Sequence, residues 1–155
     1  MNLTLLEAEL RRDENVRYLP YLDTAEPPRR TIGAGHNMDA APLPTEWTFP
    51  LTDAQVNQLL AQDIAKACAG LDHFLPWWRS LDDVRSRVLA NMAFNMGIGK
   101  LLTFRNTLTD MKLGFYAAAA NGMRSSLWAR QVGARAQRLA RAMETGVMPD
   151  EPIAD

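Results

Sequence analysis

The sequence predicts an α+β fold, with a small N-terminal lobe made of one helix and a β-hairpin, a connecting helix, and an all-helical C-terminal lobe. Three observations support this prediction. A strand, turn and returning strand are indicated at positions 16–32, closed by glycines at 33 and 35. A helix with a clear start signal follows at about positions 52–69. From position 70 onward the apolar residues show only helical patterns, with no strand signal.

The first element is a helix with a start signal at Thr4. Thr4 and Glu7 have the spacing of a capping box, in which two side chains satisfy free backbone N–H groups at a helix N-terminus. Leucines at positions 5, 6 and 10 give this helix an apolar side. The pattern changes at residues 13–15, so we expect the helix to span about 4–13.

A short β-hairpin is expected after this helix. Residues 16–22 are rich in Val, Tyr and Leu and contain one proline, which is typical of an edge strand. Residues 23–28 have the composition of a turn, and residues 30–32 are expected to form the returning strand. Residues 37–50 contain three prolines and are expected to form a loop.

The connecting helix begins with a second capping box, made by Thr52 and Gln55. We expect this helix to end near residue 69. Gly97 and Gly146 lie where glycines end helices. The further helices are expected at about residues 76–80, 82–96, 101–113, 115–121, 126–131 and 134–145, followed by a loose tail at 148–155.

Composition excludes several classes of protein. The single cysteine, Cys68, cannot form an internal disulfide. No apolar run approaches the ~18 residues of a membrane span, and the first ten residues carry two glutamates and no basic residue, so we expect no signal peptide and no stable membrane insertion. Two histidines and one cysteine, widely separated, predict no metal site, and we expect no cofactor.

The formal net charge of −1 conceals an asymmetry between the two parts of the chain. Residues 79–141 contain eleven Arg and Lys against three Asp, whereas the remainder is acidic. A basic half indicates an anionic partner, and nucleic acid, lipid and the bacterial wall all qualify. A nucleic-acid binder would use the basic helical face of Arg130, Arg135, Arg138 and Arg141, but no recognised DNA-binding motif supports it.

Glu14 and Asp23 are candidates for acid–base chemistry. Glu14 ends the apolar helix just before a strand, and Asp23 lies nine residues on, where that strand ends. Hydrolysis of a glycosidic bond requires two carboxyl groups in unlike environments, one protonated and one ionised. Thr31 adds a hydroxyl on the opposing strand. Acidic residues near a turn are usually solvated surface, so the spacing alone does not decide between these interpretations.

Several separated motifs together resemble the phage lysozymes of glycoside hydrolase family 24. The N-terminal signature is Asp13-Glu14-Asn15, Tyr21-Leu22-Asp23-Thr24 and Thr31-Ile32-Gly33-Ala34-Gly35-His36. Residues 81–85 and 91–97 look like the family's central buried helix, and residues 104–108 like the next one. The resemblance covers roughly residues 3–147. It implies a lysozyme-like fold and a single lysozyme domain over residues 1–155, with an N-terminal lobe of about 12–51, a connecting helix of about 52–69, and a C-terminal lobe of about 70–147 on which helix 4–13 packs.

The resemblance also implies the site residues. Glu14 would be the general acid, Asp23 would position or activate the attacking water, and Thr31 would assist it. Arg135 falls where the family has a basic partner for the catalytic Glu, and His36 and Asp63 fall on positions that pair. Gly35, His36, Phe94 and Asn95 would contact substrate, while Arg135, Asp63 and Trp128 would support the site.

The activity implied is that of an N-acetylmuramidase, a glycoside hydrolase that cuts the β-1,4 bond between N-acetylmuramic acid and N-acetylglucosamine, with inversion. The protein would be an endolysin, made in the host cytoplasm and released through holin pores to the wall in the periplasm. Its partner would be peptidoglycan, with no nucleic acid, and it would be a monomer. The alternative is a lysozyme-fold module with weak catalysis that binds peptidoglycan or a protein partner.

Three departures from the family pattern stand out. The segment between Asp23 and Thr31 is two residues longer, with two prolines inside it, so Thr31 could be displaced. Asn15 replaces a glycine, and Asn tolerates a left-handed backbone better than most residues. The chain is near neutral, whereas well-known members are strongly basic.

Overall fold

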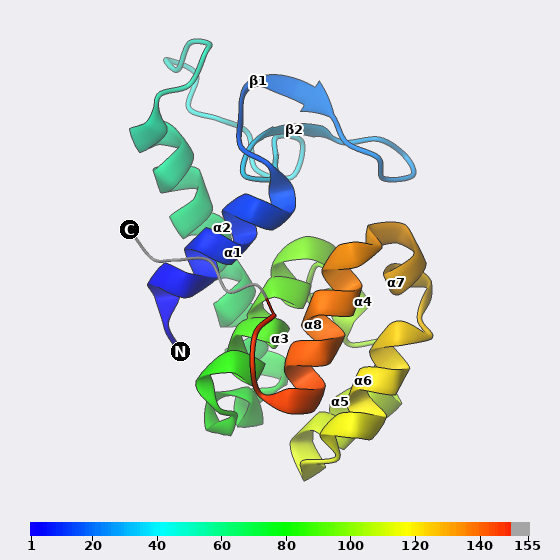
Figure 1. Cartoon of the computed structure of the whole chain (residues 1–155). Helices are drawn as coiled ribbons and strands as arrows, with labels where there is room; N and C mark the ends of the chain where they lie inside the picture. The colour runs from blue at the N-terminus through cyan, green and yellow to red at the C-terminus, as the bar shows by residue number, and fades with distance from the viewer. Residues whose placement is uncertain (150–155) are drawn as a thin grey trace.

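The computed structural model describes residues 1–149 and has two lobes joined by one long helix (Figure 1). Helix α1 (Leu3–Glu14) precedes a three-stranded antiparallel sheet of order β1-β2-β3, and α2 (Asp53–Phe74) leads into the helical lobe. The strands are β1 (Arg17–Leu22), β2 (Arg30–Gly33) and β3 (His36–Asn37). The other helices are η1 (Pro76–Ser80), α3 (Asp83–Met96), α4 (Ile98–Leu101), α5 (Arg105–Leu113), α6 (Tyr116–Arg124), α7 (Leu127–Val132) and α8 (Ala134–Thr145). The predicted α+β class is confirmed.

Each lobe has its own hydrophobic cluster, and α2 contributes to both. Near its start, Val56 and Leu59 pack with Ile32 of the sheet. Further along, Ile64 and Leu71 face the large cluster of the helical lobe. Helix α1 belongs to that large cluster, in which its buried leucines are Leu6 and Leu10. The end of α1 therefore lies where the sheet lobe meets the helical lobe.

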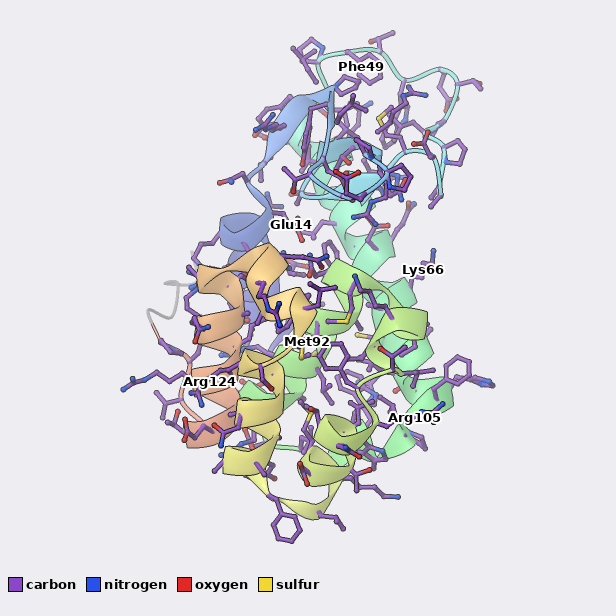
Figure 2. All side chains as sticks on the ribbon, turned by 90° about the vertical axis from the view of Figure 1, so that its right-hand side faces the viewer. Glu14, Phe49, Lys66, Met92, Arg105 and Arg124 are labelled. Carbon is purple, nitrogen blue, oxygen red and sulfur yellow. The ribbon has the colours of Figure 1, made fainter. Side chains whose placement is uncertain are left out.

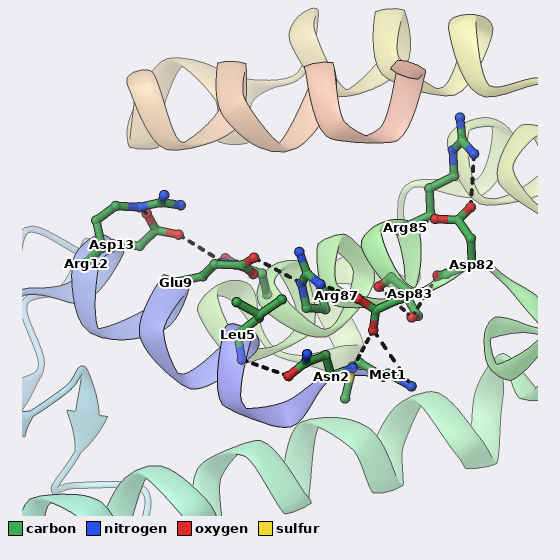
Figure 3. A network of polar contacts seen from close by, with 12 residues as sticks. Met1, Asn2, Leu5, Glu9, Arg12, Asp13, Asp82, Asp83, Arg85 and Arg87 are labelled. Atoms are coloured by element: carbon green, nitrogen blue, oxygen red, sulfur yellow. Dashed lines mark hydrogen bonds and ion pairs between the residues drawn. The ribbon is translucent and has the colours of Figure 1, made fainter. Parts of the chain in front are cut away.

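A buried ion pair fixes α1 to α3 (Figure 3). Nε of Arg87 donates to Oε1 of Glu9 at 3.0 Å, and both side chains are almost completely buried. Arg87 also donates to Asp83, whose carboxylate accepts from the backbone N–H of Asn2. Losing one partner of a buried pair leaves an uncompensated charge, so these contacts hold α1 firmly against the helical lobe.

The predicted start of α1 at Thr4 is wrong. The helix begins at Leu3, and the side chain of Asn2 caps it by accepting from the backbone N–H of Leu5 at 3.1 Å. Asn is as good an N-cap as Thr. The earlier start also places the backbone of Asn2 within reach of Asp83, a contact that the sequence pattern does not reveal.

The predicted end of the connecting helix is also wrong, by five residues. Its start is confirmed, because Thr52 and Gln55 form a complete capping box. The helix then continues through Gly70 to Phe74 and ends before Pro76. A Cβ at position 70 would lie 3.1 Å from Cβ of Ile98, so this glycine permits close packing of α4 instead of ending α2.

Smaller differences concern strand β3 and the helix ends. His36 and Asn37 pair with β2, although Asn37 was expected to begin a loop. The helix expected at 101–113 begins only at Arg105 as α5, the short helix α4 before it was not expected, and α6 runs three residues further than expected. Gly97 and Gly146 are C-caps as predicted. Met148 is buried, which contradicts a loose tail at that position, and residues 150–155 lie outside the described part. No helix within residues 1–149 combines the length and apolar character needed to cross a membrane.

Candidate active site

Glu14 is the last residue of α1 and lies between the two lobes (Figure 2). The chain turns sharply after it, because Asn15 has φ of 56°, and it is the one non-glycine residue with positive φ within residues 1–149. The turn sends the backbone directly into β1. The Glu14 side chain is 18% exposed, and its Oε1 accepts from Nη1 of Arg135 at 2.6 Å.

Arg135, on α8, connects Glu14 to the core of the helical lobe. Its Nε and Nη2 both donate to Oδ1 of Asn91 on α3, at 3.0 and 2.8 Å. The amide of Asn91 in turn donates to the fully buried carboxylate of Asp13, which also accepts from Arg138 at 2.7 Å. Burial by itself would raise the pKa of Asp13, but Arg135, Asn91 and Arg138 lower it. Three helices thus fix the Glu14 carboxyl in one position.

Gly35 forms the wall beside the other oxygen of Glu14. A Cβ at position 35 would lie 2.7 Å from Oε2 of Glu14, and the residue has φ of +76°. Both the close approach and the backbone conformation require glycine. Oε2 therefore packs against bare backbone at the point where α1 meets the loop after β2.

Asp23 follows β1 and is held by the hairpin tip. Its Oδ1 accepts from the backbone N–H groups of Ala25 at 3.1 Å and Arg29 at 2.8 Å. Its Oδ2 accepts from Nε of Arg29 at 2.9 Å. Burial by itself would raise the pKa of Asp23, but these hydrogen bonds and the Arg29 charge lower it, so the carboxyl is ionised at neutral pH.

The longer hairpin tip does not remove Thr31 from this region. Thr31 pairs with Tyr21 across the β1–β2 ladder and is buried, with its hydroxyl donating to the carbonyl of Arg29 at 2.9 Å. Glu14, Asp23 and Thr31 line one cleft together. Its other lining residues are Tyr21, Arg29, Gly35, Asn37, Phe94 and Asn95.

The cleft continues into a larger groove between the sheet lobe, α2 and α3. Gly35, Phe94 and Asn95 line both parts. Nε1 of the buried Trp128 donates to Oδ1 of Asn95 at 2.7 Å, which fixes the orientation of that amide. Of the residues expected to contact substrate, Gly35, Phe94 and Asn95 are therefore brought to the cleft.

His36 does not line the cleft or the groove, and its ring is buried. Nδ1 lies 2.7 Å from Oδ2 of Asp63, and Nε2 lies 2.7 Å from the carbonyl oxygen of Ala41. Both partners are acceptors, so the imidazolium, with two N–H donors, satisfies both. Burial lowers the pKa of His36, but Asp63 and Ala41 more than compensate and raise it. The ring ties β3 to α2 and is not free to bind a ligand.

Sequence reasoning missed several residues of the site. Arg29 contacts both Asp23 and Thr31, and Asp13 and Asn91 fix Arg135. The only signal for Arg29 was its place in the lengthened segment between Asp23 and Thr31. The basic face proposed for nucleic acid is also interrupted, because Arg135 is buried against Glu14 and Arg138 is paired with Asp13.

The fold and the cleft define a two-lobed α+β protein with paired carboxyl groups between its lobes. The sequence model of the phage lysozyme family matches residues 11–144, and the chain belongs to this family. This membership supports a function of the lysozyme type.

Three curated relatives extend the comparison. The chain is 29% identical to the pre-baseplate central spike protein Gp5 of Enterobacteria phage T4 over 94% of its length, which is 28% of that protein. It is 28% identical to probable T4-type lysozyme 1 of Dictyostelium discoideum, over 63% of this chain and 59% of the relative. With probable T4-type lysozyme 2 of the same organism the identity is 32%, over 47% of this chain and 43% of the relative. The chain thus spans less than two thirds of each of these relatives.

Proposed function

We propose that the protein is an N-acetylmuramidase that hydrolyses the β-1,4 bond between N-acetylmuramic acid and N-acetylglucosamine in peptidoglycan, with inversion. The observation that carries this proposal is that Glu14, Asp23 and Thr31 line one cleft. The surroundings of the two carboxyl groups differ, which suits the two parts of glycoside hydrolysis. Glu14 accepts from Arg135 on one oxygen and packs against Gly35 on the other, whereas Asp23 accepts from N–H donors on both oxygens.

Glu14 would be the general acid. Because Nη1 of Arg135 donates to Oε1, the proton of the acid form belongs on Oε2, the oxygen beside Gly35. From there it would pass to the glycosidic oxygen as the bond to the anomeric carbon breaks. Arg135 would then stabilise the carboxylate that remains.

Asp23 and Thr31 would hold the attacking water. The hydroxyl hydrogen of Thr31 is used by the Arg29 carbonyl, so Oγ1 presents a lone pair. A water that donates one hydrogen to Asp23 and the other to Thr31 has its own lone pair free for the anomeric carbon. As the new C–O bond forms, Asp23 would take the proton, and attack from the face opposite the leaving group gives inversion.

The finer biological setting belongs to the same proposal. The protein would act as a monomer and a single domain over residues 1–155, with its two lobes joined by α2 (Asp53–Phe74). As an endolysin it would be made in the host cytoplasm and reach the wall in the periplasm through holin-type release. The match to the phage lysozyme family over residues 11–144 supports the lysozyme part of this proposal.

A second candidate is a lysozyme-fold module with weak catalysis that serves in a larger assembly. The match to a baseplate spike protein over 94% of the chain favours it. The two candidates differ in whether lysis of the wall requires the proton of Glu14. A module that only binds would not depend on it.

Glu14→Gln tests the proposal against this alternative. The amide oxygen of Gln can still accept from Arg135, so the fold should be retained, while the proton donor is lost. We expect lysis of outer-membrane-permeabilised Gram-negative cells, followed by turbidity, to fall about 10²–10⁴-fold. Glu7→Gln, on the same helix outside the cleft, is the matched control and should match wild type. Lysis by Glu14→Gln at the wild-type rate would contradict the proposal.

A further inference from the structure

Arg29 contacts both groups of the proposed water site. Its backbone N–H and its Nε bind the two oxygens of Asp23, at 2.8 and 2.9 Å. Its carbonyl accepts from the hydroxyl of Thr31 at 2.9 Å and from the backbone N–H of Asp23 at 3.0 Å. A single residue of the extended hairpin tip therefore connects the carboxylate and the hydroxyl.

These contacts fix both acceptors. With the N–H of Ala25 also on Oδ1, Asp23 has a donor on each oxygen and cannot rotate without breaking at least one bond. Thr31 cannot turn its hydroxyl hydrogen toward the cleft while it donates to Arg29. The hairpin thus presents two acceptors, which is the arrangement that orients one water by its two hydrogens.

The charges around Asp23 give Arg29 a second effect. Glu14 from α1 and Tyr21 from β1 line the same cleft, and Arg29 from the hairpin tip is the cation within it. Burial disfavours the charge of Asp23, whereas the guanidinium of Arg29 and the N–H donors of the hairpin tip favour it, so the pKa of Asp23 is lowered.

We propose that Arg29 is a positioning residue that orients Asp23 and Thr31 toward the attacking water. The inference rests on the proposed function, and it explains how a hairpin two residues longer than the family pattern retains its water site. The neighbouring Arg30 differs, because its exposed side chain lies 4.0 Å from Asp39 and lines neither the cleft nor the groove.

The kinetic test compares Arg29→Gln and Arg29→Lys, with Arg30→Gln as the matched control. The Arg29 side chain is 47% exposed, and its backbone contacts persist in every variant, so all three proteins should fold. With purified peptidoglycan, we expect Arg29→Gln to lower kcat about 10–100-fold, a part of the full acid–base effect. The acidic limb of its pH profile of kcat should also shift to higher pH. Arg29→Lys keeps the positive charge but not the planar fork of the guanidinium. We expect the acidic limb of this variant to lie close to that of wild type, while its kcat stays lowered.

A second measurement separates this inference from the proposed function. The pKa of Asp23 can be followed by carboxyl ¹³C NMR without substrate, and it should rise in Arg29→Gln and stay unchanged in Arg30→Gln. An unchanged Asp23 titration and an unchanged acidic limb in folded Arg29→Gln would overturn the inference. If the proposed function itself were wrong, Glu14→Gln would instead lyse cells at the wild-type rate.

Discussion

Arg135 and Glu14 lie 121 positions apart in the chain, yet Nη1 of the first lies 2.6 Å from Oε1 of the second. The same guanidinium donates twice to Asn91 and lies 3.6 Å from Asp13. The contact places the end of α1 against α8 and α3 at the rim of the cleft. The hydrogen bonds that orient Glu14 therefore come from the core of the helical lobe, while Gly35 of the sheet lobe packs against its other oxygen.

Arg135→Ala should destabilise the protein and abolish most lysis. The change removes a 7% exposed charge and leaves Asp13 and Asn91 without their common partner. Loss of one member of a buried ion pair costs about 3–5 kcal/mol. Urea denaturation measures this loss, and Arg141→Ala, an exposed position on the same helix, should change the free energy of unfolding by less than about 0.5 kcal/mol. Equal stability of the two variants would contradict this account.

Gly35→Ala should disturb the Glu14 carboxyl directly. A methyl group at position 35 would lie 2.7 Å from Oε2, and the positive φ of residue 35 adds strain of about 1–3 kcal/mol. We expect lysis to fall at least about tenfold, since small displacements of a catalytic group are costly. The control is Gly99→Ala, where a Cβ meets open space and φ is not positive. That variant should be neutral or more stable, and a Gly35→Ala protein of normal activity would refute the close contact.

The His36–Asp63 pair should make stability depend on pH. The pKa of His36 is raised in the folded state, so the protonated ring stabilises the protein fully below the unfolded pKa of about 6.5. This stabilisation is lost as the pH rises through the folded pKa. Urea denaturation between pH 5.5 and 8.5 should show unfolding free energy declining across that window.

Asp63→Asn should flatten this pH dependence and lower stability at pH 5.5 by about 1.5–3 kcal/mol, the contribution of a hydrogen bond to a charged group. His73→Gln removes the exposed second histidine and should leave the dependence unchanged. A pH dependence that survives in Asp63→Asn would show that another group is responsible.

Local features of the fold were predictable because their causes are local. Thr52 and Gln55 cap α2 through groups three residues apart, and Gly97 and Gly146 end helices at positive φ. Gly70, next to the expected end of α2 near residue 69, instead lies inside the helix, where its missing side chain accommodates Ile98 from another helix. A sequence pattern cannot distinguish a glycine that ends a helix from one that admits a neighbour.

The charge asymmetry between the two parts of the chain is reduced in the folded structure by ion pairs between them. Several cations of the basic half pair with acids from the other half, as Arg87 does with Glu9, Arg79 with Asp72 and Arg138 with Asp13. Among the described residues, no ion pair is formed by five cations of that half, which are Lys100, Arg105, Lys112, Arg130 and Arg141. The basic character of residues 79–141 is therefore partly neutralised within the fold.

By itself the sequence determined the hairpin and most of the helices, since capping and periodicity act over a few residues, and the resemblance of its motifs to the phage lysozymes supplied the candidate trio of Glu14, Asp23 and Thr31. Only the tertiary structure decided which groups orient that trio. Arg135 reaches Glu14 from α8, and Arg29 joins Asp23 to Thr31 through a turn whose path depends on its backbone. Such contacts depend on distances in space, which spacing along the chain does not fix.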